Sequence, residues 1–273
     1  MSIVDILKPT RDSMPRPERN QLTQVAQQVW RFADEQAHEL EKHADTDRYF
    51  AACIRVAASN LMSMLKLSSP YMSESGAIFR NLLEACIDFF WVASFSESQP
   101  DKCKRLAENF FLYGKAQFVE NAPAYSKLCK SDPFLRDIKG PFDDIDAIEQ
   151  CRKDVGARVF GNSWRYDPAI FADEAETRWK ARSQIAAAFV EKAVRLKQAP
   201  YLANLRALSS YSHFDPAQLS QSTAEFRDRL FDRDINIAIG FVFDMLMFSY
   251  RQKMSQPPQA LVVLQHQFLW FST

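Results

Sequence analysis

Apolar side chains recur every three or four residues along most of this 273-residue chain, which is the spacing of one face of an α-helix. No run of residues shows the alternation that a half-buried strand requires. The chain holds only six glycines, which argues against a turn-rich all-β fold. We therefore expect an all-α protein.

The helical pattern predicts a single helical bundle of about eight to ten helices over residues 20–273, preceded by an N-terminal arm at residues 1–19. An irregular excursion is expected near 131–172, which holds three of the six glycines and three prolines. The fourth helix should end before Pro123, and Asp45 or Thr46 should cap the second. The helices are expected over residues 20–43, 46–67, 70–95, 100–122, 142–155, 173–198, 200–213, 223–253 and 259–271.

Charge and motif content narrow the function classes. Lys plus Arg and Asp plus Glu both number 34, so the chain lacks the basic surplus of a nonspecific DNA-coating protein. This balance does not exclude a local basic groove. No glycine-rich phosphate loop and no cluster with metal-ligand spacing is present, so we expect no cofactor and no metal. Cys53 and Cys86 fit small core residues. We expect a cytoplasmic protein, with no signal peptide and no membrane-spanning helix.

The most apolar helix, expected over residues 70–95, carries its polar side chains in one narrow stripe. Arg80, Glu84 and Asp88 lie four residues apart, with Asn81 beside them. Such a stripe either faces solvent or forms a semi-buried Arg80–Glu84 pair against another helix. Further on, charges of alternating sign over residues 225–234 are typical of ion pairs on an exposed helix.

A second polar face is expected on the helix over residues 200–213. Arg206, Ser209 and His213 share this face, with Tyr201 on the neighbouring apolar side, and Arg206 and His213 are about 10.5 Å apart along the axis. Histidine exchanges a proton near neutral pH and arginine clamps a phosphate, a combination that suits metal-free phosphodiester cleavage. In the alternative interpretation, His213 bonds a backbone carbonyl or Ser209 and Arg206 is solvated.

Cations near Trp179 on the helix expected over residues 173–198 could extend this face into a phosphate-binding groove. Acidic residues interleave with them, so a solvated face remains the alternative. The apolar stretch at 260–271 should either close the bundle or form a dimer contact.

Several of these motifs together resemble an uncharacterised bacterial helical family catalogued as domain of unknown function 5677. The motifs are Arg80-Asn-Leu-Leu-Glu84, Trp179, Tyr201 and Ser209-Ser-Tyr-Ser-His213 followed by Pro216. The similarity covers about residues 45–250 and implies a helical fold without an established activity.

The Arg206-x6-His213 spacing also resembles the Arg-x4-6-His motif of the HEPN superfamily, although Ala207 stands where a polar residue usually follows the arginine. That resemblance implies a dimeric, metal-independent ribonuclease, or an RNA-binding relative, of a bacterial defence or toxin–antitoxin system. RNA and a second copy of the chain would be its partners. The alternative is a non-catalytic helical module that binds another protein, with Arg80–Glu84 as a structural clamp.

Overall fold

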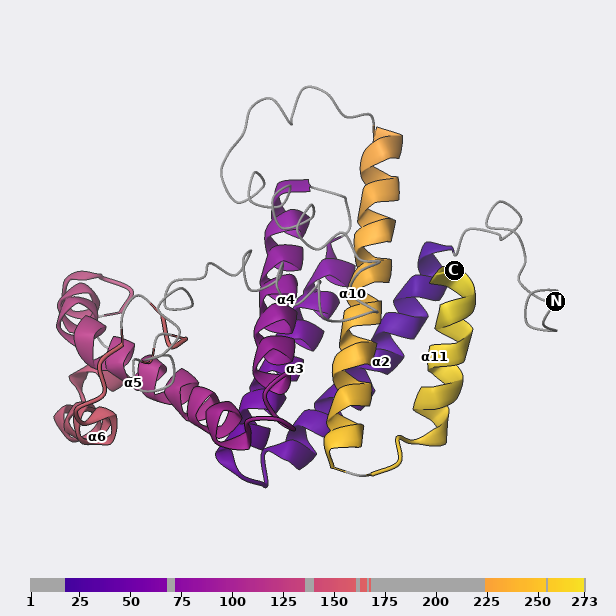
Figure 1. The fold of residues 1–273 in the computed structure, drawn as a ribbon. Coiled ribbons are helices and arrows are strands. Elements are labelled where there is room, and N and C mark those ends of the chain that lie inside the picture. Colours follow the sequence, from indigo (N-terminus) through magenta and orange to yellow (C-terminus); the bar gives the residue numbers. More distant parts are fainter. Residues whose placement is uncertain are drawn as a thin grey trace. The chain divides into compact units, whose positions relative to one another are not determined.

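The structure, a computed structural model, describes residues 18–67, 72–135, 140–160, 163–165, 167, 224–253 and 255–272. Within these residues the chain is all-α, as predicted, with seven α-helices, one short 3-10 helix and no strand. The elements are α2 (Arg19–Leu40), α3 (Asp45–Lys66), α4 (Met72–Ala93), α5 (Pro100–Ser131), η2 (Pro141–Asp143), α6 (Ile145–Val155), α10 (Ala224–Gln252) and α11 (Gln259–Ser272) (Figure 1). The helices expected over residues 173–198 and 200–213 lie outside the described residues.

The described residues divide into two compact units. The first contains α2, α3, α10, α11 and α4 as far as Trp91. The second begins at Val92 and contains α5, η2, α6 and the described residues up to Asp167. The single-domain organisation of residues 20–273 stays a prediction.

In the first unit, α2 and α3 pack together and α10 packs against both. The buried face of α2 repeats at helical spacing through Leu22, Val25, Ala26, Val29, Ala33, Ala37 and Leu40. Arg19 of α2 pairs with Asp228 at 3.2 Å and Asp232 at 2.8 Å on α10, and Lys253 at the end of α10 pairs with Asp47 at the start of α3. These pairs show that α10 runs parallel to α2 and antiparallel to α3.

The two most apolar helices of the first unit contribute to its core. The buried apolar side chains of α4 within this unit are Phe79, Leu82, Leu83, Cys86, Ile87 and Phe89. Helix α11 buries Leu261, Leu264 and Phe268, which lie on one face, and the ring of Phe268 lies 5.5 Å from that of Phe243 in α10. Of the two expected roles for the C-terminal apolar stretch, the structure therefore shows packing within this unit.

In the second unit, α5 continues through Pro123 to Ser131, so the predicted end before this proline is wrong. A proline inside a helix lacks one N–H donor, but the neighbouring turns can still be held by side chains. Here the ring of Phe142 from η2 stacks between Phe118 at 5.2 Å and Tyr125 at 4.6 Å, which lie on either side of Pro123. This stack bridges the break in the hydrogen-bond ladder.

The predicted short helix at 142–155 is confirmed as α6. The Asp144 carboxylate accepts a hydrogen bond from the Ala147 N–H at 2.9 Å and caps the helix, which ends at Gly156 with a positive φ of 57°. The predicted cap of α3 is wrong, because Ala44 holds the N-cap position and Asp45 lies in the first turn. A carboxylate in the first turn is still favourable to the helix dipole.

Candidate functional site

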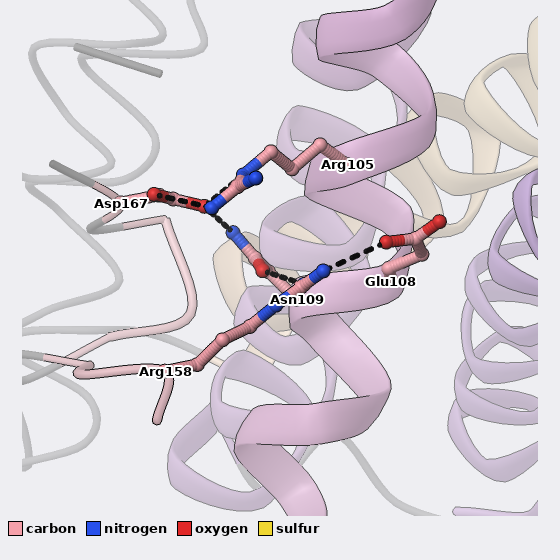
Figure 2. A network of polar contacts seen from close by, with 5 residues as sticks. All are labelled: Arg105, Glu108, Asn109, Arg158 and Asp167. Atoms are coloured by element: carbon pink, nitrogen blue, oxygen red, sulfur yellow. Dashed lines mark hydrogen bonds and ion pairs between the residues drawn. The ribbon is translucent and has the colours of Figure 1, made fainter. Parts of the chain in front are cut away.

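A network of five polar residues joins α5 to the segment that follows α6 in the second unit (Figure 2). Arg105 and Asn109 are four residues apart on α5 and therefore lie on the same helix face, with Glu108 beside them. Arg158 and Asp167 approach this face from the later segment. We call these five residues the α5 clasp.

Asn109 is the centre of the α5 clasp, because both ends of its amide are used. Its Nδ2 donates to Asp167 Oδ2 at 2.7 Å, and its Oδ1 accepts from Arg158 at 2.6 Å. Asp167 also accepts a forked pair of bonds from Arg105, at 2.7 Å from Nε and 3.3 Å from the terminal nitrogen. Arg158 donates its second bond to Glu108 at 3.0 Å. The bonds therefore form one continuous chain from Arg105 to Glu108.

Burial makes the α5 clasp energetically sensitive. Asn109 is fully buried and Asp167 is 6% exposed, whereas 40% of the Arg105 side chain remains exposed. The hydrogen bond from Arg105 to Asp167 is the main cause that raises the pKa of this guanidinium, and burial opposes it. A buried carboxylate is tolerated only when it is paired and hydrogen-bonded. The loss of Arg105 would leave Asp167 with the Asn109 amide as its contact in the clasp.

The charged groups of the α5 clasp pair with one another, which fits a structural role. Its two guanidinium groups balance its two carboxylates, and each guanidinium already bonds a carboxylate. The adjacent Trp164 ring packs edge-on against Phe110 at 5.5 Å and 89°, and Arg165 lies 4.8 Å from the Trp164 ring centre. Polar and aromatic contacts therefore act together to hold Arg158, Trp164 and Asp167 against α5.

The α5 clasp was not predicted from the sequence, although one signal for it was present. Asn109 lies three residues after Leu106 and four before Tyr113, in the apolar stripe that predicted this helix. A polar side chain in such a stripe indicates a buried hydrogen-bonded group. Its partner Asp167 lies 58 residues away, at a distance that no local pattern connects to it.

The polar stripe of α4 is partly buried. Arg80 Nε lies 3.0 Å from Glu84 Oε1, with 29% and 19% of the two side chains exposed. Asp88, one turn further on, is 6% exposed, whereas Asn81 is exposed. The pair is therefore partly shielded from solvent, and its role as a structural clamp stays a prediction.

The sequence pattern predicted the wrong environment for Asp234 on α10. The alternating charges of residues 225–234 predicted an exposed ion-pair face, but only 13% of the Asp234 side chain is exposed. Burial raises the pKa of this carboxyl to about 7, and Arg233, at 3.3 Å, opposes the shift. The prediction is wrong for Asp234, because the pattern does not show which side of α10 faces the core, whereas Asp228 and Asp232 of the same run do form ion pairs with Arg19.

The residues predicted to form a catalytic face, together with two further candidate binding residues, lie outside the described part of the chain. They are Arg206, Ser209, His213, Tyr201 and Trp179. Their arrangement and their roles stay predictions.

The described residues are therefore all-α, and their second unit holds a clasp centred on the buried side chains of Asn109 and Asp167. Among the described residues, no group of three or more His, Cys, Asp or Glu side chains is placed to hold a metal ion. No described helix is long and apolar enough to cross a membrane. Comparisons of the chain with family models, curated proteins and solved structures found no match.

Proposed function

We propose that this chain is a HEPN-like protein that binds RNA and cleaves it without a metal ion, in a bacterial defence or toxin–antitoxin setting. One sequence observation carries the proposal: Arg206, Ser209 and His213 recur at the spacing of a single helix face. The all-α character of the described residues is compatible with a HEPN-like fold.

In the proposed reaction, His213 takes the proton from a ribose 2′-hydroxyl, and the 2′-oxygen attacks the adjacent phosphorus. The bond from phosphorus to the 5′-oxygen of the next nucleotide breaks. That oxygen takes a proton from solvent, and His213 later returns to solvent the proton that it removed. Arg206 binds the phosphate and stabilises the negative charge that develops on it. Ser209 offers a hydroxyl on the same face to orient the phosphate. The products are a 2′,3′-cyclic phosphate end and a 5′-hydroxyl end.

The test is incubation of the purified chain with mixed RNA in the presence of a divalent-metal chelator. Wild type should cleave, whereas His213→Ala and Arg206→Ala should each lose about 100-fold or more in rate. His266→Ala is the matched control, because His266 is an exposed histidine of α11 outside the motif. Equal rates in wild type and His213→Ala, or no cleavage by either, would contradict the catalytic proposal.

The finer organisation belongs to the same proposal. Residues 45–250 would form the core of the family catalogued as domain of unknown function 5677, within a single bundle of about eight to ten helices. The excursion near 131–172 would be a functional or interface-forming insertion. The resemblance to HEPN proteins supports a dimer whose two copies share a cleft. It also supports a cytoplasmic location.

A specific observation favours a second function, that of a helical module that binds another protein. Seven large apolar side chains are exposed among the described residues, and five of them come from the second unit. These five are Tyr125, Leu128, Phe134, Ile145 and Val159. Helix α6 buries none of its residues. Exposed apolar side chains that lie together mark interaction surfaces, and the second candidate function supposes that these five do so.

The second candidate predicts an association that depends on these side chains. The double variant Leu128→Asp, Phe134→Asp should lower the mass measured by light scattering at micromolar concentration, with unchanged helical content by circular dichroism. Val56→Asp is the control, because Val56 is an exposed apolar residue of α3 in the first unit. A wild type that stays monomeric and binds no protein partner would count against this function.

A further inference from the structure

Three aromatic side chains form a layer where α3, α4 and α10 of the first unit meet. Each helix supplies one ring: Phe50 from α3, Phe89 from α4 and Phe248 from α10. Their centres are 4.9 Å apart for Phe50 and Phe89, 5.5 Å for Phe89 and Phe248, and 6.0 Å for Phe50 and Phe248. The three contacts fix the register of the three helices relative to one another.

Two sulfur atoms, those of Cys86 and Met245, meet one turn away, and Cys53 holds the corresponding position on α3; we call these three residues the sulfur layer. α3 runs antiparallel to α10, so a step from Phe50 to Cys53 on α3 corresponds to a step from Phe248 to Met245 on α10. The same step on α4 leads from Phe89 to Cys86, whose Sγ lies 3.4 Å from Met245 Sδ. A three-residue step moves about 4.5 Å along a helix axis, which places Cys53, Cys86 and Met245 at one level.

The sulfur layer is buried. Cys53 is 5% exposed, and Cys86 and Met245 are fully buried. Cys53 also lies close enough to Cys86 for the two thiols to interact electrostatically.

We propose that Cys53, Cys86 and Met245 form a three-sulfur site for a soft monovalent cation of the Cu(I) class. Thiolate and thioether ligands favour such ions over hard divalent cations. On binding, the two thiols would lose their protons to solvent, and the cation would bond to two thiolates and one thioether. The site would then carry one net negative charge, and no oxidation or reduction takes place. This inference does not depend on the proposed ribonuclease activity.

The experiment uses the full chain without its other cysteines, which could also bind Cu(I). This background carries the substitutions Cys103→Ala, Cys129→Ser and Cys151→Ser. It is titrated with Cu(I) under anaerobic, reducing conditions against a chromogenic Cu(I) chelator. X-ray absorption counts the sulfur ligands, and a weakly buffered titration counts released protons. We expect one Cu(I) per chain, three sulfur ligands and about two protons released per ion.

Single variants distinguish Cu(I) ligation by these three residues from their ordinary packing in the core. Cys86→Ala or Cys53→Ala in this background should weaken Cu(I) binding by about 100-fold or more. Met245→Leu keeps the side-chain volume and the fold, and should reduce the sulfur count from three to two. Met64→Leu is the matched control, because Met64 is a fully buried methionine of α3 outside the layer.

Two results would overturn the proposal. One is a background protein that holds no Cu(I) against the chelator. The other is a sulfur count that Met245→Leu leaves unchanged, which would place the ion elsewhere. Because Met245→Leu preserves packing, this second criterion holds even if a cysteine variant fails to fold.

Discussion

Replacement of Asp234 with asparagine should remove a pH dependence from the folding of the first unit. Burial raises the pKa of this carboxyl from its ordinary value of 3.8 to about 7. The folded chain therefore keeps the proton at pH values where the unfolded chain has lost it. Since the folded state binds more protons between these two values, the free energy of unfolding falls as the pH rises from about 4 to about 7.

The magnitude follows from the two pKa values. Each tenfold change in the ionisation equilibrium is about 1.4 kcal/mol, so ionisation of the buried carboxyl costs about 4 kcal/mol in total. Roughly 2.5 kcal/mol of this loss falls between pH 5 and pH 8. Asparagine has no charge to desolvate, so Asp234→Asn should be more stable than wild type at pH 8, with a smaller advantage at pH 5.

The assay is urea unfolding of wild type and Asp234→Asn at several values between pH 5 and pH 8, followed by circular dichroism. Asp228→Asn is the control, because Asp228 lies on the same helix with 49% of its side chain exposed. The difference between Asp234→Asn and wild type should grow with pH, whereas that for Asp228→Asn should stay small. Parallel curves for wild type and Asp234→Asn would refute the reasoning.

Three further predictions concern the α5 clasp and the core of the first unit. Arg105→Ala should lower the free energy of unfolding, measured in urea, by about 2 kcal/mol. A double-mutant cycle with Asp167→Asn should show a coupling energy of about 1 kcal/mol, and additive effects of the two substitutions would contradict the clasp. Burial raises the pKa of the Cys86 thiol, and Cys53, Asp244 and Asp88 raise it further. Iodoacetamide at pH 8 should therefore label Cys86 only after unfolding, as measured by peptide mass spectrometry. Rapid labelling of Cys86 in the native chain would contradict this burial. Phe268→Ala should lower the unfolding free energy by about 3 kcal/mol, because it removes a buried ring that packs α11 on α10, and an unchanged thermal midpoint would contradict that packing.

The helices of the described residues were largely predictable because helical periodicity is a local property. The buried face of α2 and the short helix α6 follow from side chains three or four residues apart and from turn residues such as Asp144 and Gly156. The end of α5 was mispredicted at Pro123, because the stack of Phe118, Phe142 and Tyr125 across it involves a residue 19 positions further along the chain.

Polar contacts within one helix could likewise be predicted from the sequence, whereas those between distant segments could not. By itself the sequence determined the all-α character of the described residues and the Arg80–Glu84 spacing, since four residues on one helix place two side chains together. Only the tertiary structure decided that Arg105 and Asn109 meet Asp167, that Asp234 is buried, and that Cys86 contacts Met245. The physical reason is that burial and long-range contact depend on which helix faces pack against one another, and side-chain spacing within a single helix does not specify this.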